Sequence, residues 1–169
     1  MEKLKKSLKL SSLSLSDCKI GVSMPHYEYD PTENEIVQAL QSVFQSMGYG
    51  DIEVRYAQNN SEAQYMDITY MIDEGCNVII LWAVDGNEIG TIMDEYPDTY
   101  FIALYDLIYN TGELNCFIEP DYKELGRMQG EYIRDTFDLD NATETFRIDM
   151  VMFDSDSDRA MYEGITEVL

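Results

Sequence analysis

Short runs of consecutive hydrophobic residues alternate along the chain with segments in which hydrophobic residues recur at helical spacing. The run Asn77–Trp82 is apolar almost throughout, which is typical of a strand buried on both faces of a parallel sheet. The runs predict strands at 19–24, 51–57, 77–82, 99–104, 116–118 and 146–153.

Helical periodicity fills the intervals between these runs. Ser61 is expected to cap the second helix, and Gly75 to end it. Further helices are predicted over 87–95, around 125–133 and from about 161 to 169. The first helix carries its hydrophobic face on Ile36, Val37, Leu40, Val43, Phe44 and Met47.

This alternation predicts an α/β fold whose parallel strands are joined by right-handed crossovers. In such a sheet, ligands bind beyond the carboxyl ends of the strands. Mostly polar or acidic residues follow the predicted strands, as a polyhydroxylated or cationic ligand would require, although each is also typical of a solvated loop. These positions are Pro25 and His26, 58–60, Asp85, 105–107 and 154–159.

Sequence signatures of catalysis and cofactor binding are lacking. No GxGxxG, GxxxxGK[ST] or GxSxG motif follows a strand, and His26 has no neighbouring Ser or Cys partner. The three cysteines, Cys18, Cys76 and Cys116, form no CxxC or Cys/His pattern, so we expect neither a metal nor a disulfide framework. We expect no cofactor, and we expect Cys76 to be a buried small hydrophobe.

Charge divides the chain into two parts. Its 169 residues include 33 acidic and 11 basic ones, for a net charge of −22. In residues 1–19 five lysines outweigh two acidic residues, a charge of +3, whereas the remaining six basic and 31 acidic residues give −25. Such an acidic body would repel phosphates, so we expect no nucleic-acid partner. The hydrophobic share of 45% is sufficient for a folded core.

The basic leader occupies residues 1–18. Its lysines, Leu/Ser stretch and Cys18 resemble a bacterial lipoprotein signal, but serines interrupt the apolar stretch and Asp17 stands where a small residue is expected. We interpret 1–18 as a basic leader or a degenerate signal segment, with a lipidated Cys18 as the alternative. No hydrophobic run reaches the roughly 18 residues that span a bilayer.

An ordered series of segments resembles a known family. The series is KIGVSMP, MGYGDIEVRYAQNN, SEAQYMDITYMIDEGCNVIILWAVDG, YFIALYDLI and IEPDYKELGRMQGEYI. It is similar to the sugar-binding proteins of bacterial ABC transporters, in the periplasmic binding protein type 1 class, and especially to the xylose- and multiple-monosaccharide-binding type. The likeness covers about residues 19–169, in which DLDNATETFRIDMVMFDSDSDRAMYEGITEVL resembles the start of the second lobe.

The resemblance implies two doubly wound α/β lobes that close on a sugar or related polyol by a hinge motion. It also implies docking on an ABC transporter permease, an extracytoplasmic location and no catalytic residues. By this resemblance, 19–112 is the N-terminal lobe and 113–169 is part of a second lobe. A full family member is considerably longer, so the chain looks truncated.

The resemblance also places ligand contacts. Asp85–Gly86 matches the family pattern and Asp106 is retained, but Leu107 replaces an arginine. The loop after the first strand lacks the family's Arg and Trp, so Tyr29 and its neighbours would supply the ring-stacking face; alternatively, the site has lost its ligand contacts. The predicted ligand-binding residues are His26, Tyr27, Asp85, Asp106, Asp121 and Arg159.

An incomplete second lobe would expose apolar strand faces and an unpaired sheet edge, so we expect a homodimer through this lobe or poor solubility of the isolated chain. An alternative function is a ligand-sensing module of a signalling system, because the same lobes serve as sensors. A phosphoacceptor enzyme is disfavoured, since the first strand ends at Met24–Pro25 and no lysine follows Lys123.

Overall fold

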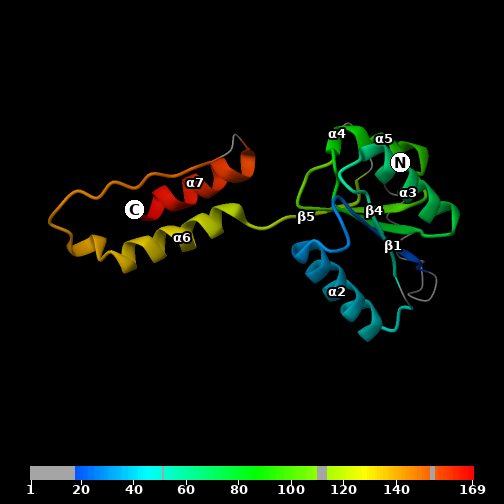
Figure 1. The fold of residues 1–169 in the computed structure, drawn as a ribbon, viewed down its shortest axis with the longest axis horizontal. Helices are drawn as coiled ribbons and strands as arrows, with labels where there is room; N and C mark the ends of the chain where they lie inside the picture. Colours follow the sequence, from blue (N-terminus) through cyan, green and yellow to red (C-terminus); the bar gives the residue numbers. More distant parts are fainter. Residues whose placement is uncertain (1–17, 51, 110–113, 153–154) are drawn as a thin grey trace, which may run out of the picture. The chain divides into compact units, whose positions relative to one another are not determined.

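The computed structural model describes residues 18–50, 52–109, 114–152 and 155–169, which fall into two compact units (Figure 1). Unit 1 extends to Glu119, and unit 2 comprises Pro120–Leu169. Among the helices that the structure describes, none combines the length and the apolar character that crossing a bilayer requires.

Unit 1 is built on a five-stranded sheet with the order β2-β1-β3-β4-β5. Every neighbouring pair is parallel, and Val22 in β1 lies opposite Val54 in β2 and Ile80 in β3. The predicted parallel α/β fold is therefore confirmed. The strands are β1 (Ile20–Met24), β2 (Glu53–Tyr56), β3 (Val78–Leu81), β4 (Tyr100–Leu104) and β5 (Cys116–Ile118).

Helices cover both faces of this sheet, as a doubly wound fold requires (Figure 1). Successive strand residues point to opposite faces, so Ile80 packs with Val37 of α2 whereas Ile79 packs with Met71 of α3. Cys76 is buried beside α3, as expected, and this burial raises the pKa of its thiol. The helices are α2 (Pro31–Ser46), α3 (Ser61–Asp73), α4 (Gly86–Ile89) and α5 (Thr91–Glu95).

Two boundaries differ from the sequence-based expectation. The helix predicted over 87–95 is two short helices that meet at Gly90. The strand β5 pairs with β4, so residues 116–118 belong to the sheet of unit 1 even though the family resemblance assigned 113–169 to a second lobe. A strand is assigned by its hydrogen-bonded neighbour, and that neighbour is not visible in the local sequence.

One buried amide connects the central strands. The Gln64 side chain, on α3, is completely buried. Its Nε2 donates to Ser23 Oγ at 3.1 Å and to the Trp82 carbonyl at 2.8 Å, and its Oε1 accepts from the Val84 N–H at 2.8 Å. Gln64 therefore satisfies backbone groups just beyond β3, where the ladder ends and water is excluded.

Replacing Gln64 by Met should lower the free energy of unfolding by about 2–3 kcal/mol, because the Trp82 carbonyl and Val84 N–H would remain buried without partners. Urea unfolding followed by far-UV circular dichroism measures this change. The exposed Gln45 on α2 supplies the matched control, and Gln45→Met should change stability by less than about 0.5 kcal/mol. Equal stability of the two variants would contradict the role assigned to Gln64.

Unit 2 contains two helices in close contact, α6 (Tyr122–Thr136) and α7 (Asp156–Val168), together with the short η2 (Leu139–Asn141). Both helices run in the same direction (Figure 1). Glycines allow the approach, because a Cβ on Gly126 would collide with the Met161 carbonyl and one on Gly164 with the Lys123 carbonyl. At the same contact Lys123 Nζ lies 2.5 Å from Glu167 Oε1.

The strand predicted at 146–153 is wrong for 146–152, the part that the structure describes. These residues form no strand, although flanking α6 and α7 agree with the predicted helices. A run of apolar residues becomes a strand only when another strand pairs with it, and unit 2 offers none among its described residues. The expected apolar exposure is present, with Phe146 half exposed.

The helix contact of unit 2 can be tested at Gly164. Alanine normally favours a helix over glycine by about 1 kcal/mol, yet Gly164→Ala should destabilise the α6–α7 pair because its Cβ has no room. We expect a net loss of about 1–3 kcal/mol, measured as reduced amide protection in α7 by hydrogen exchange. The adjacent, exposed Glu163→Ala should leave the protection nearly unchanged, and equal effects would argue against a glycine-dependent contact.

Candidate functional site

The candidate site lies where the connectivity of the sheet reverses. β1 and β3 are neighbours, but the chain continues from β1 outward to β2 and from β3 outward to β4. The loops after β1 and β3 therefore diverge to opposite sides, and such a reversal point is where ligands commonly bind in α/β sheets. His26 follows β1 and Trp82 follows β3.

Four side chains meet at this point, and we call them the switch-point cluster: His26, Trp82, Tyr105 and Asp106. The Trp82 indole stacks on Tyr105 with ring centroids 4.5 Å apart and meets His26 edge-on at 6.0 Å. Its Nε1–H donates to Asp106 Oδ2 at 2.7 Å. Three strands, β1, β3 and β4, thus contribute to one aromatic platform with a carboxylate at its edge.

The start of α2 positions His26. Asp30 caps this helix by accepting from the Thr32 and Glu33 N–H groups, and Pro31 fits the first helical turn. The cap points the completely buried Glu33 carboxylate at His26, where it accepts from the backbone N–H at 3.1 Å and contacts ring Nδ1. Since Nδ1 is engaged and no described residue bonds to Nε2, Nε2 remains for a ligand.

The backbone at Tyr105 is strained. Its φ is +62°, a region that residues with a Cβ rarely adopt, and the Asp106 N–H donates across it to the Leu104 carbonyl at 2.7 Å. This tight turn directs Asp106 back towards Trp82. Leu107, the residue after Asp106, packs closely on Gly86, because a Cβ on Gly86 would collide with the Leu107 carbonyl. Strained backbone held by its surroundings is common at ligand sites.

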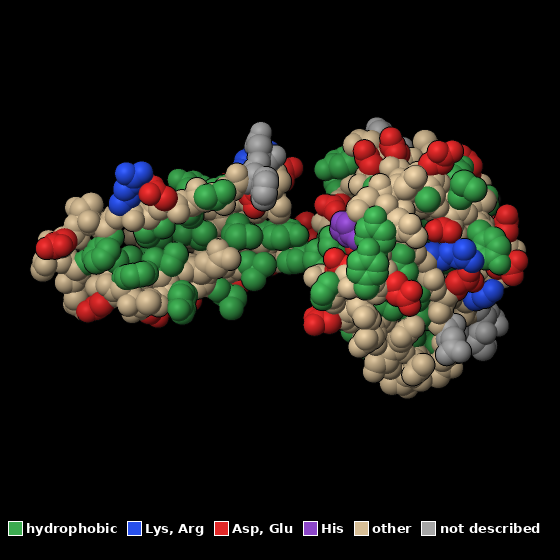
Figure 2. All heavy atoms as spheres, in the orientation of Figure 1, with side chains coloured by type: hydrophobic (Ala, Val, Ile, Leu, Met, Phe, Trp, Pro, Cys, Tyr) green, Lys and Arg blue, Asp and Glu red, His purple; other side chains and the backbone are tan. Residues whose placement is uncertain are grey.

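The arrangement is suited to binding. It offers a flat aromatic face, a carboxylate acceptor and one ring nitrogen, which together match a small ring that carries hydroxyl groups. Figure 2 shows the single histidine at the surface of unit 1, beside acidic and hydrophobic side chains. Among the described residues, no group of three His, Cys, Asp or Glu side chains is arranged to hold a metal ion.

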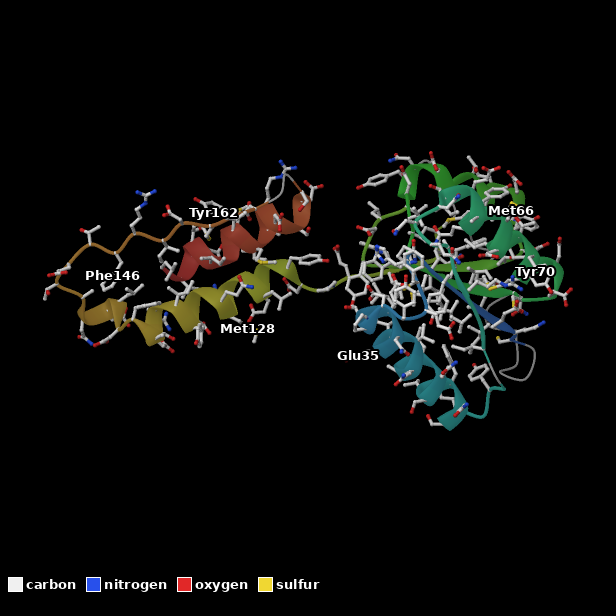
Figure 3. The ribbon with its side chains drawn as sticks, in the orientation of Figure 1. Glu35, Met66, Tyr70, Met128, Phe146 and Tyr162 are labelled. Atoms are coloured by element: carbon white, nitrogen blue, oxygen red, sulfur yellow. The ribbon has the colours of Figure 1, made fainter. Side chains whose placement is uncertain are left out.

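Tyr27 lies apart from this cluster in a different surface feature. Its ring stacks on Tyr29 at 5.2 Å, and both line an open groove of about 470 Å³ beside the edge strand β2. Burial, together with the Glu28 and Glu33 carboxylates, raises the pKa of Tyr56 in the same groove. Arg55, also in the groove, stacks 4.1 Å from the ring centroid of Tyr70, which Figure 3 shows on α3.

The other predicted site residues have local partners. Asp85 caps α4 by accepting from the Asn87 N–H at 2.8 Å. In unit 2, Asp121 caps α6 by accepting from the Glu124 N–H at 2.9 Å. The predictions that placed them at a ligand stay predictions, as does that for Arg159, which pairs with Asp156 at 3.1 Å.

Sequence reasoning missed Trp82, Tyr105 as its stacking partner, and Glu33. Trp82 ends an apolar run, which predicts a place in a buried strand, although it is the only tryptophan and directly precedes a loop. The Asp30–Glu33 spacing at a helix start was a usable signal for a capping pair. The contact between Glu33 and His26 depends on the path of the loop, which the sequence does not encode locally.

The family model described as "Periplasmic binding protein domain" matches residues 20–169. The chain belongs to this family. The family resemblance seen in the sequence is therefore confirmed. Two curated periplasmic proteins match over 89% of the chain. They are the multiple sugar-binding receptor ChvE of Rhizobium radiobacter, 26% identical, and the multiple sugar-binding protein SbpA of Azospirillum brasilense, 25% identical. The chain spans 43% of the length of each.

Solved structures of this family share the fold. An ABC transporter solute-binding protein from Clostridium phytofermentans with bound β-D-glucose is 25% identical, with a TM-score of 0.71. The match covers 88% of this chain and 47% of that one. A Caulobacter myo-inositol-binding protein with bound myo-inositol has a TM-score of 0.65 at 18% identity, over 91% of this chain and 51% of that one. At that identity the likeness shows the fold alone.

Trp82 is the only tryptophan, so its fluorescence reports directly on the cluster. Asp106→Ala should change the emission of Trp82 and increase its quenching by acrylamide, because the indole loses its hydrogen-bond acceptor. We expect a stability loss of only about 1 kcal/mol, since Asp106 is exposed. The exposed Asp94→Ala on α5 is the control, and an unchanged Asp106→Ala spectrum would contradict the contact.

Proposed function

We propose that this chain binds a monosaccharide or a related polyol for uptake by an ABC transporter, and that the switch-point cluster is its ligand-contacting surface in unit 1. The observation that carries the proposal is the Trp82 indole at the reversal point of the sheet, stacked on Tyr105 and bonded to Asp106. This position is where α/β folds bind their ligands.

The chemistry of the cluster suits a sugar. One face of a sugar ring presents C–H groups, which pack on an aromatic surface, while the hydroxyls need hydrogen-bonding partners. Asp106 accepts through a carboxylate. Because Nδ1–H of His26 faces the Glu33 carboxylate, Nε2 of the neutral ring accepts a hydrogen bond from a hydroxyl. Because Glu33 holds the imidazole in place, His26 loses little freedom on binding, and this preorganisation favours affinity.

Membership of the family and the ligands of the relatives support the ligand class. The curated relatives are named as multiple sugar-binding periplasmic proteins, and a solved relative contains β-D-glucose. On this basis we propose an extracytoplasmic location, an ABC permease as partner and no catalysis. Asp121 and Arg159 are proposed as the contribution of unit 2 to ligand binding.

A sensing role is the second candidate. One solved structure with the same fold, at 19% identity and a TM-score of 0.60, is a fructose-binding periplasmic domain of a hybrid two-component system. The ligand chemistry would be the same in both cases. Neighbouring genes for a permease and an ATPase favour transport, whereas a neighbouring kinase gene favours sensing.

The proposal is tested by titrating the protein with pentoses, hexoses and inositols while recording Trp82 fluorescence and the melting temperature. A ligand that binds the folded state stabilises it by mass action and so raises the melting temperature. At a ligand concentration one hundred times Kd, the free energy of unfolding increases by about 2.7 kcal/mol. We expect a saturable change in both signals with at least one sugar. No response to any of them at millimolar concentration would contradict the proposal.

Variants then locate the site. His26→Ala should weaken binding about tenfold, because it removes one hydrogen bond to the ligand, with a larger loss for Trp82→Ala, which removes the stacking face. Calorimetric titration measures both, since the second variant lacks the fluorophore. Asp94→Ala should bind as tightly as the wild type, and unchanged binding by Trp82→Ala would place the ligand elsewhere.

A further inference from the structure

The polar atoms of the switch-point cluster are mainly hydrogen-bond acceptors. Asp106 uses Oδ2 to accept from the Trp82 Nε1–H at 2.7 Å, and in the described part of the chain no group bonds to its other oxygen, Oδ1. His26 contributes Nε2, which accepts in the neutral ring because the Nδ1 proton faces Glu33. The Tyr105 hydroxyl can donate or accept. A ligand here therefore has to supply hydrogen-bond donors, and Asp106 Oδ1 can accept from a charged one.

No basic side chain is available to neutralise this end of the sheet. The structure describes two basic residues in unit 1, Lys19 and Arg55. Lys19 precedes β1, at the amino ends of the parallel strands, and its Nζ donates to the Glu74 carbonyl at 2.7 Å. Arg55 pairs with Glu53 at 3.1 Å and with Asp67 at 3.3 Å, so its charge is neutralised beside β2.

Carboxylates gather at the carboxyl ends of the strands. Glu28 follows β1, Asp85 follows β3 and Asp106 follows β4, while the buried Glu33 lies against His26. No Lys or Arg that the structure describes is paired with any of the three loop carboxylates. On the face shown in Figure 2, acidic side chains border the histidine. The electrostatic potential at the cluster is therefore negative, which attracts cations and repels anions.

We propose that the ligand of the switch-point cluster is a polyhydroxylated organic cation, an amino sugar or an amino polyol, whose ammonium group donates to Asp106 Oδ1. The aromatic rings of the cluster add to this preference, since their faces attract cations. The hydroxyls of the ligand donate to His26 Nε2. This inference rests on the proposed function and deepens it by naming the charge of the ligand.

Charge distinguishes this ligand from a neutral sugar and from a sugar acid. A neutral hydroxyl can also donate to Asp106, but it brings no charge to offset the surrounding carboxylates. A sugar acid would place a further carboxylate against them and would be repelled. An ammonium group has nearly the size of the hydroxyl that it replaces, so a comparison of the two compounds isolates the effect of the charge. The expected order of affinity is amino sugar, neutral sugar, sugar acid.

Calorimetric titration of the full chain with matched pairs of compounds tests the proposal. The pairs are glucosamine and glucose, galactosamine and galactose, and glucamine and sorbitol, with glucuronate as the anion. The titrations are run at about pH 7, below the usual amine pKa of about 7.7–8.0, and at about 150 mM salt, which screens charges beyond about 8 Å. At least one amino compound should bind about tenfold or more tightly than its neutral partner.

The outcomes separate this inference from the proposed function. Neutral compounds that bind as tightly as their amino partners, or tighter binding of glucuronate than of glucose, would overturn the inference and leave the proposed function standing. Failure of the amino compounds alone would have the same meaning. Failure of every neutral and amino compound would overturn both.

A variant tests the role of Asp106. Asp106→Asn keeps the size and one acceptor but removes the charge, so it should weaken binding of the amino compound more than that of its neutral partner. The preference should fall from about tenfold to about twofold or less. Asp94→Asn, at an exposed position on α5, changes the net charge equally and should keep the full preference. An unchanged preference in Asp106→Asn would overturn the proposal.

A simple cation distinguishes the site from general attraction to an acidic surface. Ethanolamine carries an ammonium group and one hydroxyl, but it has no ring or chain of hydroxyls to reach His26 and the aromatic rings. It should show no saturable binding at the concentration that saturates the amino sugar. Binding of ethanolamine as tight as that of the amino sugar would show attraction of cations alone and would overturn the proposal.

Discussion

The pairing of β1 with β3 is the contact on which the rest of unit 1 depends. The ladder continues past the end of β3, where the Trp82 N–H donates to the Ser23 carbonyl at 3.0 Å. The Gln64 side chain then donates to the Trp82 carbonyl and to Ser23 Oγ, which the ladder leaves without partners. Because these backbone groups are all satisfied, the loops after β1 and β3 can diverge without a penalty in unpaired polar groups. The reversal point between them is a direct consequence of this pairing.

The same pairing determines the chemistry at the switch-point cluster. It brings His26, which follows β1, against Trp82, which follows β3, and β4 adds Tyr105 and Asp106 from the other side. Two energetically unfavourable features occur there, a positive φ at Tyr105 and a buried carboxylate at Glu33. Both hold a side chain of the platform in one orientation, which is what a rigid binding surface needs.

Unit 2 shows what happens when backbone pairing is absent. Its helices approach closely through Gly126 and Gly164, yet Ile165 is the only hydrophobic residue buried among those described in this unit. The residues 146–152 have the composition and alternation of a strand, but no strand among the described residues of this unit pairs with them. The apolar side chains of Phe146, Ile148, Met150 and Met152 are therefore only partly covered.

The sequence by itself determined the order and type of nearly all elements, because hydrophobic periodicity and the stop at Gly75 are local signals. The predicted cap was wrong by one residue, since Asn60 and not Ser61 caps α3. The sequence also indicated which loops reach the ligand end of the sheet, including His26 and Asp106. Only the tertiary structure decided that Trp82 joins them while Tyr27 lies in a separate groove, and that 146–152 forms no strand. These outcomes depend on which segments become neighbours, and contacts between residues distant in the chain leave no local pattern.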